Sequence, residues 1–313
     1  MATSVRTIDP SRLVRNPENP RLIFRSEDLQ SLEDSIKSQG ILVPLTVYED
    51  GNATVILDGE RRWRCSKKLG LSSVPVIVQP KPNRMQNIMM MFAIHHARTD
   101  WDPLPTAYKL NDLEKAFFSQ NHRYPSESEL AELASMSRGE VRRLKKLLGL
   151  PDEYRVELMK ELEKPRHLQT LTVDHVLEAT TGAEALVKRG VISSEEEDEL
   201  RRSIIQKFRT KLLRNTTDPR MLSRIARSVE RGEVSKAVAS KVVMRIIQDS
   251  DYSIEHAFRD SAAKADFGHS TEQLAERLLA RLIEMKESKY ELDGDLISVL
   301  IRIRTLISND LHI

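Results

Sequence analysis

The sequence contains very little cysteine and few aromatic residues. Cys65 is its single cysteine, and aromatic residues make up 5% of the chain, against 40% apolar and 31% charged residues. One cysteine excludes a disulfide within the chain and a cysteine-based zinc site, and it suits a reducing compartment such as the cytoplasm. Because Cys65 lies inside a basic helical segment and not at a turn, we expect it to be a packing residue.

Long apolar runs are also missing. No stretch approaches the roughly 18 apolar residues that a membrane-spanning helix needs. Residues 1–6 lack the apolar region of a secretory signal. We therefore expect a cytoplasmic protein with no membrane partner. The formal net charge of +2 says little as a total, but the cations gather in two short segments, which points to anionic partners.

The first basic segment is Val-Ile-Leu-Asp-Gly-Glu-Arg-Arg-Trp-Arg at residues 55–64. It reads as a short buried strand that turns at Asp58-Gly59 into a helix ending near Leu69. A glycine permits a sharp turn and close approach of a ligand, while a helix N-terminus favours anions. The pattern fits a phosphate cradle or a solvated basic helix face equally well. Its cations are Arg61, Arg62, Arg64, Lys67 and Lys68.

The second basic segment lies within residues 124–151. Two Ser-x-x-Glu capping boxes, at Ser126 and Ser137, each predict a helix start, and the short break between the helices is typical of a helix-turn-helix over 126–148. We expect Leu130, Leu133, Ala134, Val141, Leu144 and Leu148 to point inward. An ordinary helical hairpin with a basic face is the alternative, but the charge asymmetry of the second helix favours DNA. The predicted DNA-binding residues are Ser137, Arg138, Gly139, Arg142, Arg143, Lys145 and Lys146.

Three boxes in order then give a family resemblance. Residues 59–63 (Gly-Glu-Arg-Arg-Trp), 40–47 (Gly-Ile-Leu-Val-Pro-Leu-Thr-Val) and 70–76 (Gly-Leu-Ser-Ser-Val-Pro-Val) together resemble the N-terminal domain of the ParB partition family. The resemblance implies a domain that shares its ancestral fold with sulfiredoxin and whose arginine box grips the triphosphate of CTP. In that role Arg61 and Arg62 hold phosphates, Gly59 allows close approach and Glu60 braces the arginines. The implied nucleotide-binding residues are Gly40, Gly59, Glu60, Arg61, Arg62 and Arg98.

A further family box, Glu-Asn-x-x-Arg followed by Pro, is only partly kept. Aligned on Arg98 and Pro103, Ile94 stands at the Glu position and His95 at the Asn position. An isoleucine neither binds Mg²⁺ nor orients water. The resemblance therefore implies CTP binding, with Mg²⁺ as a possible companion, while the substitutions argue against hydrolysis. Adjacent histidines point about 100° apart on a helix, so we expect His95 and His96 to be structural and no metal site to form.

The fold expected from these patterns is an α+β N-terminal ParB/sulfiredoxin-like domain, an all-α helix-turn-helix domain and an all-α C-terminal region. The predicted boundaries are 1–82, 83–165, 166–250 and 251–313. A helix is predicted to start at Ser26 as N-cap and to stop at Gly40. Later helices are expected at 153–163, 173–189 and 194–213, and further ones start after Asp218-Pro219 and run, with a break at Gly232, to about Gln248. Residues 251–268 suggest a linker before a terminal helical hairpin that starts at Ser270.

The function that the resemblance implies is a sequence-specific DNA-binding protein of the ParB type, a CTP-regulated clamp in DNA segregation. Its partners would be double-stranded DNA, a second copy of the chain and a ParA-type ATPase, at the nucleoid or a plasmid. One alternative is a helix-turn-helix transcriptional regulator on the same scaffold without CTP hydrolysis. Another is an enzyme, either a ParB-related nuclease or a sulfiredoxin-like phosphotransferase. The sequence has no evident carboxylate cluster for the former and no cysteine at the turn for the latter.

Overall fold

The computed structural model describes residues 5–96 and 102–310, with the side chains of His95, His96 and Asp310 excepted. Its N-terminal part is built on a five-stranded sheet in the order β1-β5-β3-β4-β2. Both antiparallel and parallel pairs occur, since β3 runs antiparallel to β4 and parallel to β5. The expected mixed α+β architecture is confirmed. The strands are β1 (Val5–Ile8), β2 (Leu13–Val14), β3 (Leu45–Asp50), β4 (Ala53–Asp58) and β5 (Val74–Gln79).

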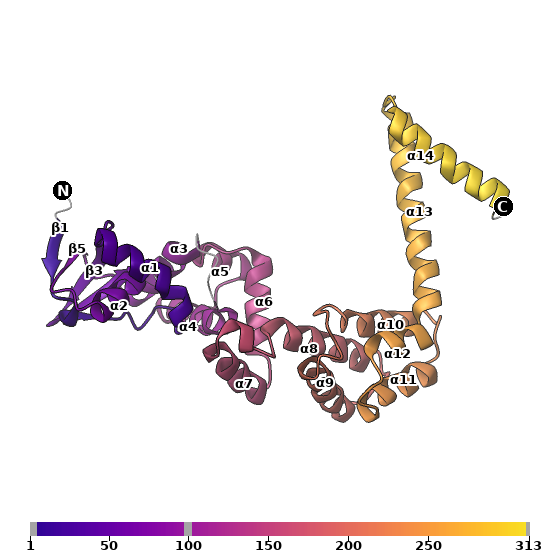
Figure 1. The fold of residues 1–313 in the computed structure, drawn as a ribbon. Helices are drawn as coiled ribbons and strands as arrows, with labels where there is room; N and C mark the ends of the chain where they lie inside the picture. Colours follow the sequence, from indigo (N-terminus) through magenta and orange to yellow (C-terminus); the bar gives the residue numbers. More distant parts are fainter. Residues whose placement is uncertain (1–4, 97–101, 311–313) are drawn as a thin grey trace.

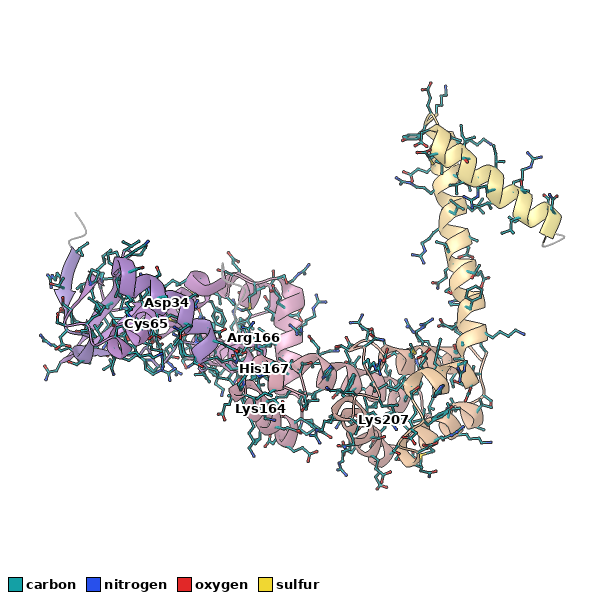
Figure 2. The ribbon with its side chains drawn as sticks, in the orientation of Figure 1. Asp34, Cys65, Lys164, Arg166, His167 and Lys207 are labelled. Atoms are coloured by element: carbon teal, nitrogen blue, oxygen red, sulfur yellow. The ribbon has the colours of Figure 1, made fainter. Side chains whose placement is uncertain are left out.

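Two helices accompany this sheet, α1 (Ser26–Gln39) and α2 (Glu60–Lys68). α1 ends as predicted at Gly40, whose φ of 73° is a conformation that glycine adopts at low cost. The prediction of Ser26 as N-cap is wrong. Arg25 holds the cap position without a side-chain cap bond, and Ser26 is the first helical residue. Cys65 is buried among these elements (Figure 2), and burial raises the pKa of its thiol, as expected for a packing residue.

The rest of the described chain is helical, as predicted (Figure 1). One continuous apolar cluster runs from Ile88 to Ala262. The helices are α3 (Arg84–His96), α4 (Pro103–Asn121), α5 (Glu127–Leu133), α6 (Arg138–Leu148), α7 (Asp152–Glu163), α8 (Val173–Lys188), α9 (Ser194–Arg209), α10 (Arg220–Glu230), α11 (Lys236–Gln248), α12 (Ile254–Ser261), α13 (Ala263–Glu287) and α14 (Gly294–Thr305). No helix in the described ranges is both long and apolar enough to cross a bilayer.

Three predictions about the later helices are wrong. α9 stops at Arg209, short of the predicted end at Leu213, because Lys211 takes a left-handed φ of 61°. The predicted linker over 251–268 is helical, since α12 begins after an N-cap at Ser253 and buries Ile254 and Phe258. α13 then starts at Ala263, well before Ser270. The N-cap at Ser253 was the sequence signal that would have placed α12.

α13 and α14 are the two predicted terminal helices, and neither contains a buried residue. Figure 1 shows α13 rising from the end of the molecule that holds α10 to α12, and α14 leaving its tip in another direction. Large apolar side chains are exposed along both helices, among them Leu274 (65%), Leu279 (60%) and Ile301 (58%). The proposed domain boundaries remain predictions.

α8 begins with a capping box that uses a histidine. The Thr172 amide donates to Nδ1 of His175 (3.2 Å), and the imidazole stacks on Phe208 with 4.1 Å between ring centroids. Only a neutral Nδ1 can accept this hydrogen bond, and burial of the ring lowers the pKa of His175 below its usual 6.5.

Because the folded protein disfavours the His175 proton, this cap contributes stability above about pH 6.5 that is lost as the pH falls through the lower folded pKa. We expect the free energy of unfolding, measured with urea between about pH 8 and 5, to fall less steeply in His175→Gln, whose amide oxygen can still cap. An unchanged pH slope in that variant would contradict the assignment.

Candidate nucleotide and nucleic-acid interfaces

The turn between β4 and α2 is built around Gly59. Its φ of 97° lies in the left-handed region, and a Cβ there would stand 2.9 Å from Cγ of buried Leu45 and 3.0 Å from Nη2 of Arg62. The turn therefore needs glycine for two separate reasons. α2 starts immediately afterwards and has no side-chain cap, so its first amides are available to an anion.

Gly59→Ala tests this requirement. The left-handed backbone and the contact with Leu45 should together lower the free energy of unfolding by about 1–3 kcal/mol, most of it local to the sheet and α2. Hydrogen exchange of α2 amides measures this directly. The control is Gly139→Ala, because a Cβ at Gly139 meets only Ser137 Oγ at 3.8 Å. Equal protection in the two variants would show that the turn tolerates a side chain.

The two central arginines of the box are bonded to backbone carbonyls. Arg61 donates to the carbonyl of Asp28, and Arg62 to those of Val43 and Pro44. Arg62 also pairs with the Asp58 carboxylate at 2.8 Å. For these guanidinium groups to hold phosphates, they would have to exchange these partners. Gly40, the other predicted glycine, stands a few residues before the carbonyls that Arg62 holds, and a Cβ at Gly40 would meet open space.

Glu60 does not brace Arg61 or Arg62, which corrects that prediction. Its carboxylate is buried and accepts hydrogen bonds from Arg64 (2.6 and 3.0 Å) and from the Asn19 amide (2.8 Å). The Arg64 guanidinium in turn lies over the Phe24 ring, 4.0 Å from its centroid. Glu60 thus joins α2 to the segment before α1. Sequence reasoning missed Asn19 and Phe24, for which only the Asn-Pro turn at Asn19 gave a signal.

Further arginines gather at the first turn of α1. The carboxylate oxygens of Asp28 lie 3.4 Å from Nη2 of Arg21, 3.8 Å from Nη1 of Arg25 and 3.8 Å from Nη2 of Arg166. With Arg61 on its carbonyl, these four form a group that we call the Asp28 arginine cluster. The Nε atoms of Arg25 and Arg61 are buried and have no hydrogen-bond partner among the described residues. The cluster therefore has positive charge and donor capacity that the described carboxylates leave unused.

The structure describes only part of the partly kept family box at residues 94–103. Ile94 packs against an apolar cluster that contains Tyr48, Leu57 and Met91. Arg98 lies outside the described residues, as does the side chain of His95. Among the residues that the structure does describe, no group of three His, Cys, Asp or Glu side chains could hold a metal ion. A phosphate group fits the donors at α2 and the Asp28 arginine cluster, whereas the residues described there form no ligand set for Mg²⁺.

The α5–α6 pair has both predicted capping boxes. The Glu129 amide donates to Ser126 Oγ and the Glu140 amide to Ser137 Oγ, each at 3.2 Å, and both glutamates accept from the cap amides in return. A hydrogen bond from Arg123 lowers the pKa of Glu129 to about 2. The predicted inward residues are all buried or half-buried. Leu147, which was not predicted, is more deeply buried than the predicted Leu148.

The cations of α6 point away from this core. Arg142 pairs with Glu127 at 2.9 Å, Arg143 with Asp174 at 2.6 Å, and half-buried Lys145 with Glu114 at 2.8 Å. Arg138 and Lys146 are exposed and form no ion pair with the described residues. Gly139 is exposed in the first turn, and the Ser137 hydroxyl donates to Glu140. The predicted DNA-binding residues therefore lie together along the outer face of one helix.

Comparison with known proteins identifies relatives of the N-terminal part of the chain. The family "ParB N-terminal domain" matches residues 1–93. The chain carries a ParB N-terminal domain. A probable chromosome-partitioning protein ParB of Xylella fastidiosa is 37% identical over 173 residues, which cover 54% of this chain and 53% of that protein. The chain thus spans about half the length of the curated ParB relatives it matches.

Solved structures of C-terminally truncated ParB from Caulobacter crescentus are similar as well. The one complexed with CTP-gamma-S is 29% identical, covering 52% of this chain and 89% of that chain, with a TM-score of 0.29. The one complexed to the centromeric parS site is 27% identical, covering 63% and 98%, with a TM-score of 0.38. The family match to residues 1–93 covers the sheet, α1, α2 and most of α3, the part that we call the ParB domain.

Proposed function

We propose that this protein is a sequence-specific DNA-binding partition protein of the ParB type, with α5–α6 as its helix-turn-helix. The observation that carries the proposal is the outer face of α6, where capping boxes fix the helix and its cations face outward. Ser137, Arg138, Gly139 and Arg142, near the helix start, would meet base edges, and Arg143, Lys145 and Lys146 would meet phosphates. The ParB relatives support this reading.

Selection of duplexes from a random pool tests the proposal. The full chain should enrich one motif, and Arg142→Ala should enrich a more degenerate one. Enrichment of no motif, with the protein folded, would overturn sequence-specific binding.

The nucleotide in this proposal is CTP. The uncapped α2 N-terminus, the arginine box and the unpaired buried Nε of Arg61 support a triphosphate, with Gly40, Gly59, Arg61, Arg62 and Arg98 around it and Glu60 holding α2 in place. When bound, the nucleotide would supply anionic oxygens that compete with the carbonyls now held by Arg61 and Arg62. Since Ile94 packs in an apolar cluster, we propose binding without hydrolysis.

A route for nucleotide control runs through the first turn of α1. Arg61 holds the Asp28 carbonyl, while Arg25 donates to the Leu162 carbonyl at 2.7 Å and Arg166 lies near the Asp28 carboxylate. Capture of Arg61 by a phosphate would therefore change a turn that also contacts the segment after α7. This connection supports a nucleotide-dependent clamp.

The partners follow from the same reading. The exposed apolar side chains of α13 and α14 favour a homodimer through these helices, because burying them would remove apolar surface from water. A ParA-type ATPase and a cytoplasmic location at the nucleoid or a plasmid are part of the partition proposal. A transcriptional regulator on the same scaffold is the second candidate, favoured by Ile94 at the position of the family's glutamate.

A further inference from the structure

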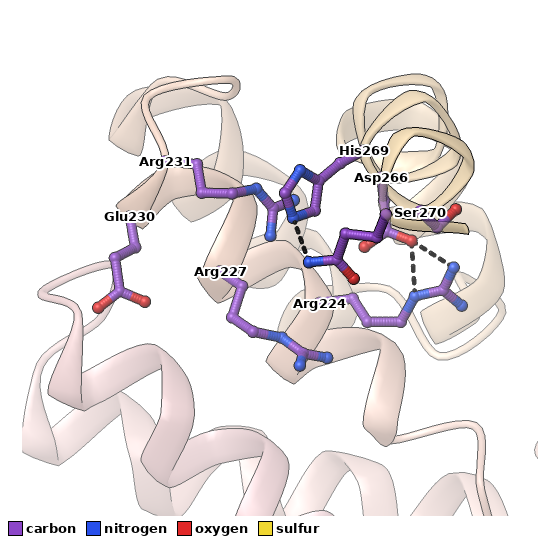
Figure 3. Close-up of a pocket in the computed structure, with 8 residues that line it drawn as sticks. Arg224, Arg227, Glu230, Arg231, Asp266, His269 and Ser270 are labelled. Carbon is purple, nitrogen blue, oxygen red and sulfur yellow. Dashed lines mark hydrogen bonds and ion pairs between the residues drawn. The ribbon is translucent and has the colours of Figure 1, made fainter. Parts of the chain in front are cut away.

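We propose that the hollow between α10 and the base of α13 binds a phosphate group, centred on Arg227. The hollow measures about 490 Å³, and Figure 3 shows Arg224 and Arg227 from α10, with Arg231 at its C-cap, facing Asp266, His269 and Ser270 from α13. A second hollow of about 530 Å³ lies on the other side of α10, and Arg227 lines both. This site is separate from the arginine box and from α6.

The arginines of this site form a row. Arg220, Arg224, Arg227 and Arg231 are spaced four, three and four residues apart, so they share one face of the helix. Gly182 of α8 lets α10 approach closely, since a Cβ there would stand 2.7 Å from the Pro219 carbonyl oxygen and 3.1 Å from Cδ1 of Leu222. The row therefore stands on a helix packed tightly against its neighbour.

In the hollow between α10 and α13, the acids leave Arg227 as the uncompensated charge of the row. Arg220 pairs with Glu178, Arg224 with Asp266 (2.9 Å from Nε) and Arg231 with Glu233 (2.7 Å). Glu230, which lines the same hollow, is held by Arg189 at 2.8 Å. Arg227 only donates to the Ser223 carbonyl of its own helix at 3.3 Å, and it has no acidic partner within the described ranges. An exposed guanidinium beside two other arginines favours an anion.

The planar donor fork of arginine matches phosphate oxygens and can engage two of them at once. The Gln273 amide, which lies 3.0 Å from Nε2 of His269, adds a polar group at the rim. Asp266, which would repel an anion, is neutralised by the Nε and Nη2 donors of Arg224. These contacts suit a phosphate better than a cation or an apolar ligand.

The phosphate can come from the DNA backbone or from a small phosphorylated molecule. The DNA source rests on the proposed function. α8 connects the two regions, because Asp174 in its first turn pairs with Arg143 of α6 and its later turns pack on α10. A helix of 16 residues is about 24 Å long, less than one turn of B-DNA at ~34 Å. A duplex held by α6 is therefore long enough to reach Arg227.

The first arm of the test measures affinity for a non-specific duplex by fluorescence anisotropy, from about 50 to about 200 mM salt. Losing one phosphate contact lowers the log–log salt slope by about 0.9. We expect that decrease in Arg227→Ala and recovery in Arg227→Lys. The control is Arg202→Ala, another exposed arginine of the same helical region, on α9. It removes the same charge and should leave the slope unchanged.

The second arm titrates inorganic phosphate at constant ionic strength and follows arginine Nε–H signals by NMR. A decreased salt slope in Arg227→Ala assigns the site to the DNA backbone. An unchanged slope, with a saturable shift that Arg227→Ala abolishes, assigns it to a small phosphorylated ligand. If a folded protein shows neither the decreased salt slope nor the saturable phosphate shift, the proposal is overturned. Arg142→Ala, run alongside, tests α6 independently, so failure of the recognition helix and failure of the Arg227 site remain distinguishable.

Discussion

Glu60→Ala is expected to lower the free energy of unfolding of the ParB domain by about 3 kcal/mol. Removing one partner of a buried ion pair costs about 3–5 kcal/mol, because the other partner stays behind without compensation. Here Arg64 and the Asn19 amide would lose their acceptor. The lower end of the range applies because the Arg64 side chain is 34% exposed and water can solvate it in part.

Hydrogen exchange of peptides that cover α2 measures this loss locally, at the helix that Glu60 holds. Glu49→Ala is the matched control, because the Glu49 side chain is 64% exposed. Its ion pair with the similarly exposed Arg6 is long, at 3.9 Å between Oε1 and Nη1. It should change stability by less than about 0.5 kcal/mol. Glu60→Gln, which keeps an acceptor oxygen, should fall between the two. If Glu60→Ala behaved like Glu49→Ala, the buried carboxylate would have no role in holding α2.

Arg142→Ala is expected to weaken specific DNA binding by about 1–3 kcal/mol and to relax base preference at one position. Folding should change little, because the Arg142–Glu127 pair is exposed on both sides, at 60% and 41%, and exposed pairs contribute at most about 1 kcal/mol. Binding assays with the selected site and with single-base variants of it measure both effects.

Glu127→Gln changes the other partner of the Arg142–Glu127 ion pair. It removes the carboxylate that holds Arg142 in the free protein, so affinity should stay equal or rise. Arg202→Ala again controls for the loss of one positive charge. Unchanged affinity and unchanged base preference in Arg142→Ala would contradict the assignment of α6 as the recognition helix.

Local sequence patterns predicted those elements whose capping or turn residues lie within a few positions of one another in the sequence. Both capping boxes of the α5–α6 pair are formed, because each joins residues three apart. The Gly40 stop and the Gly59 turn follow from backbone freedom that glycine alone has. α12 was missed because it is short and its Ser253 cap has no glutamate three residues later.

The partners of the site residues could not be predicted in this way. Glu60 is held by Asn19, and Arg61 by the Asp28 carbonyl, both far away in the sequence. The free charge of Arg227 depends on Arg189, which takes up Glu230 from another helix. Such pairings follow from the tertiary arrangement, whereas the sequence only shows which residue types are available.

Calorimetric titration of CTP, ATP, GTP and UTP with Mg²⁺, on the wild type and on Arg61→Ala, tests whether the arginine box is a CTP site. Arg6→Ala, an exposed arginine of β1, serves as the control for charge. We expect that CTP alone binds, that Arg61→Ala abolishes the binding and that Arg6→Ala preserves it. Failure of every nucleotide to bind, with and without DNA, or full binding by Arg61→Ala, would contradict it.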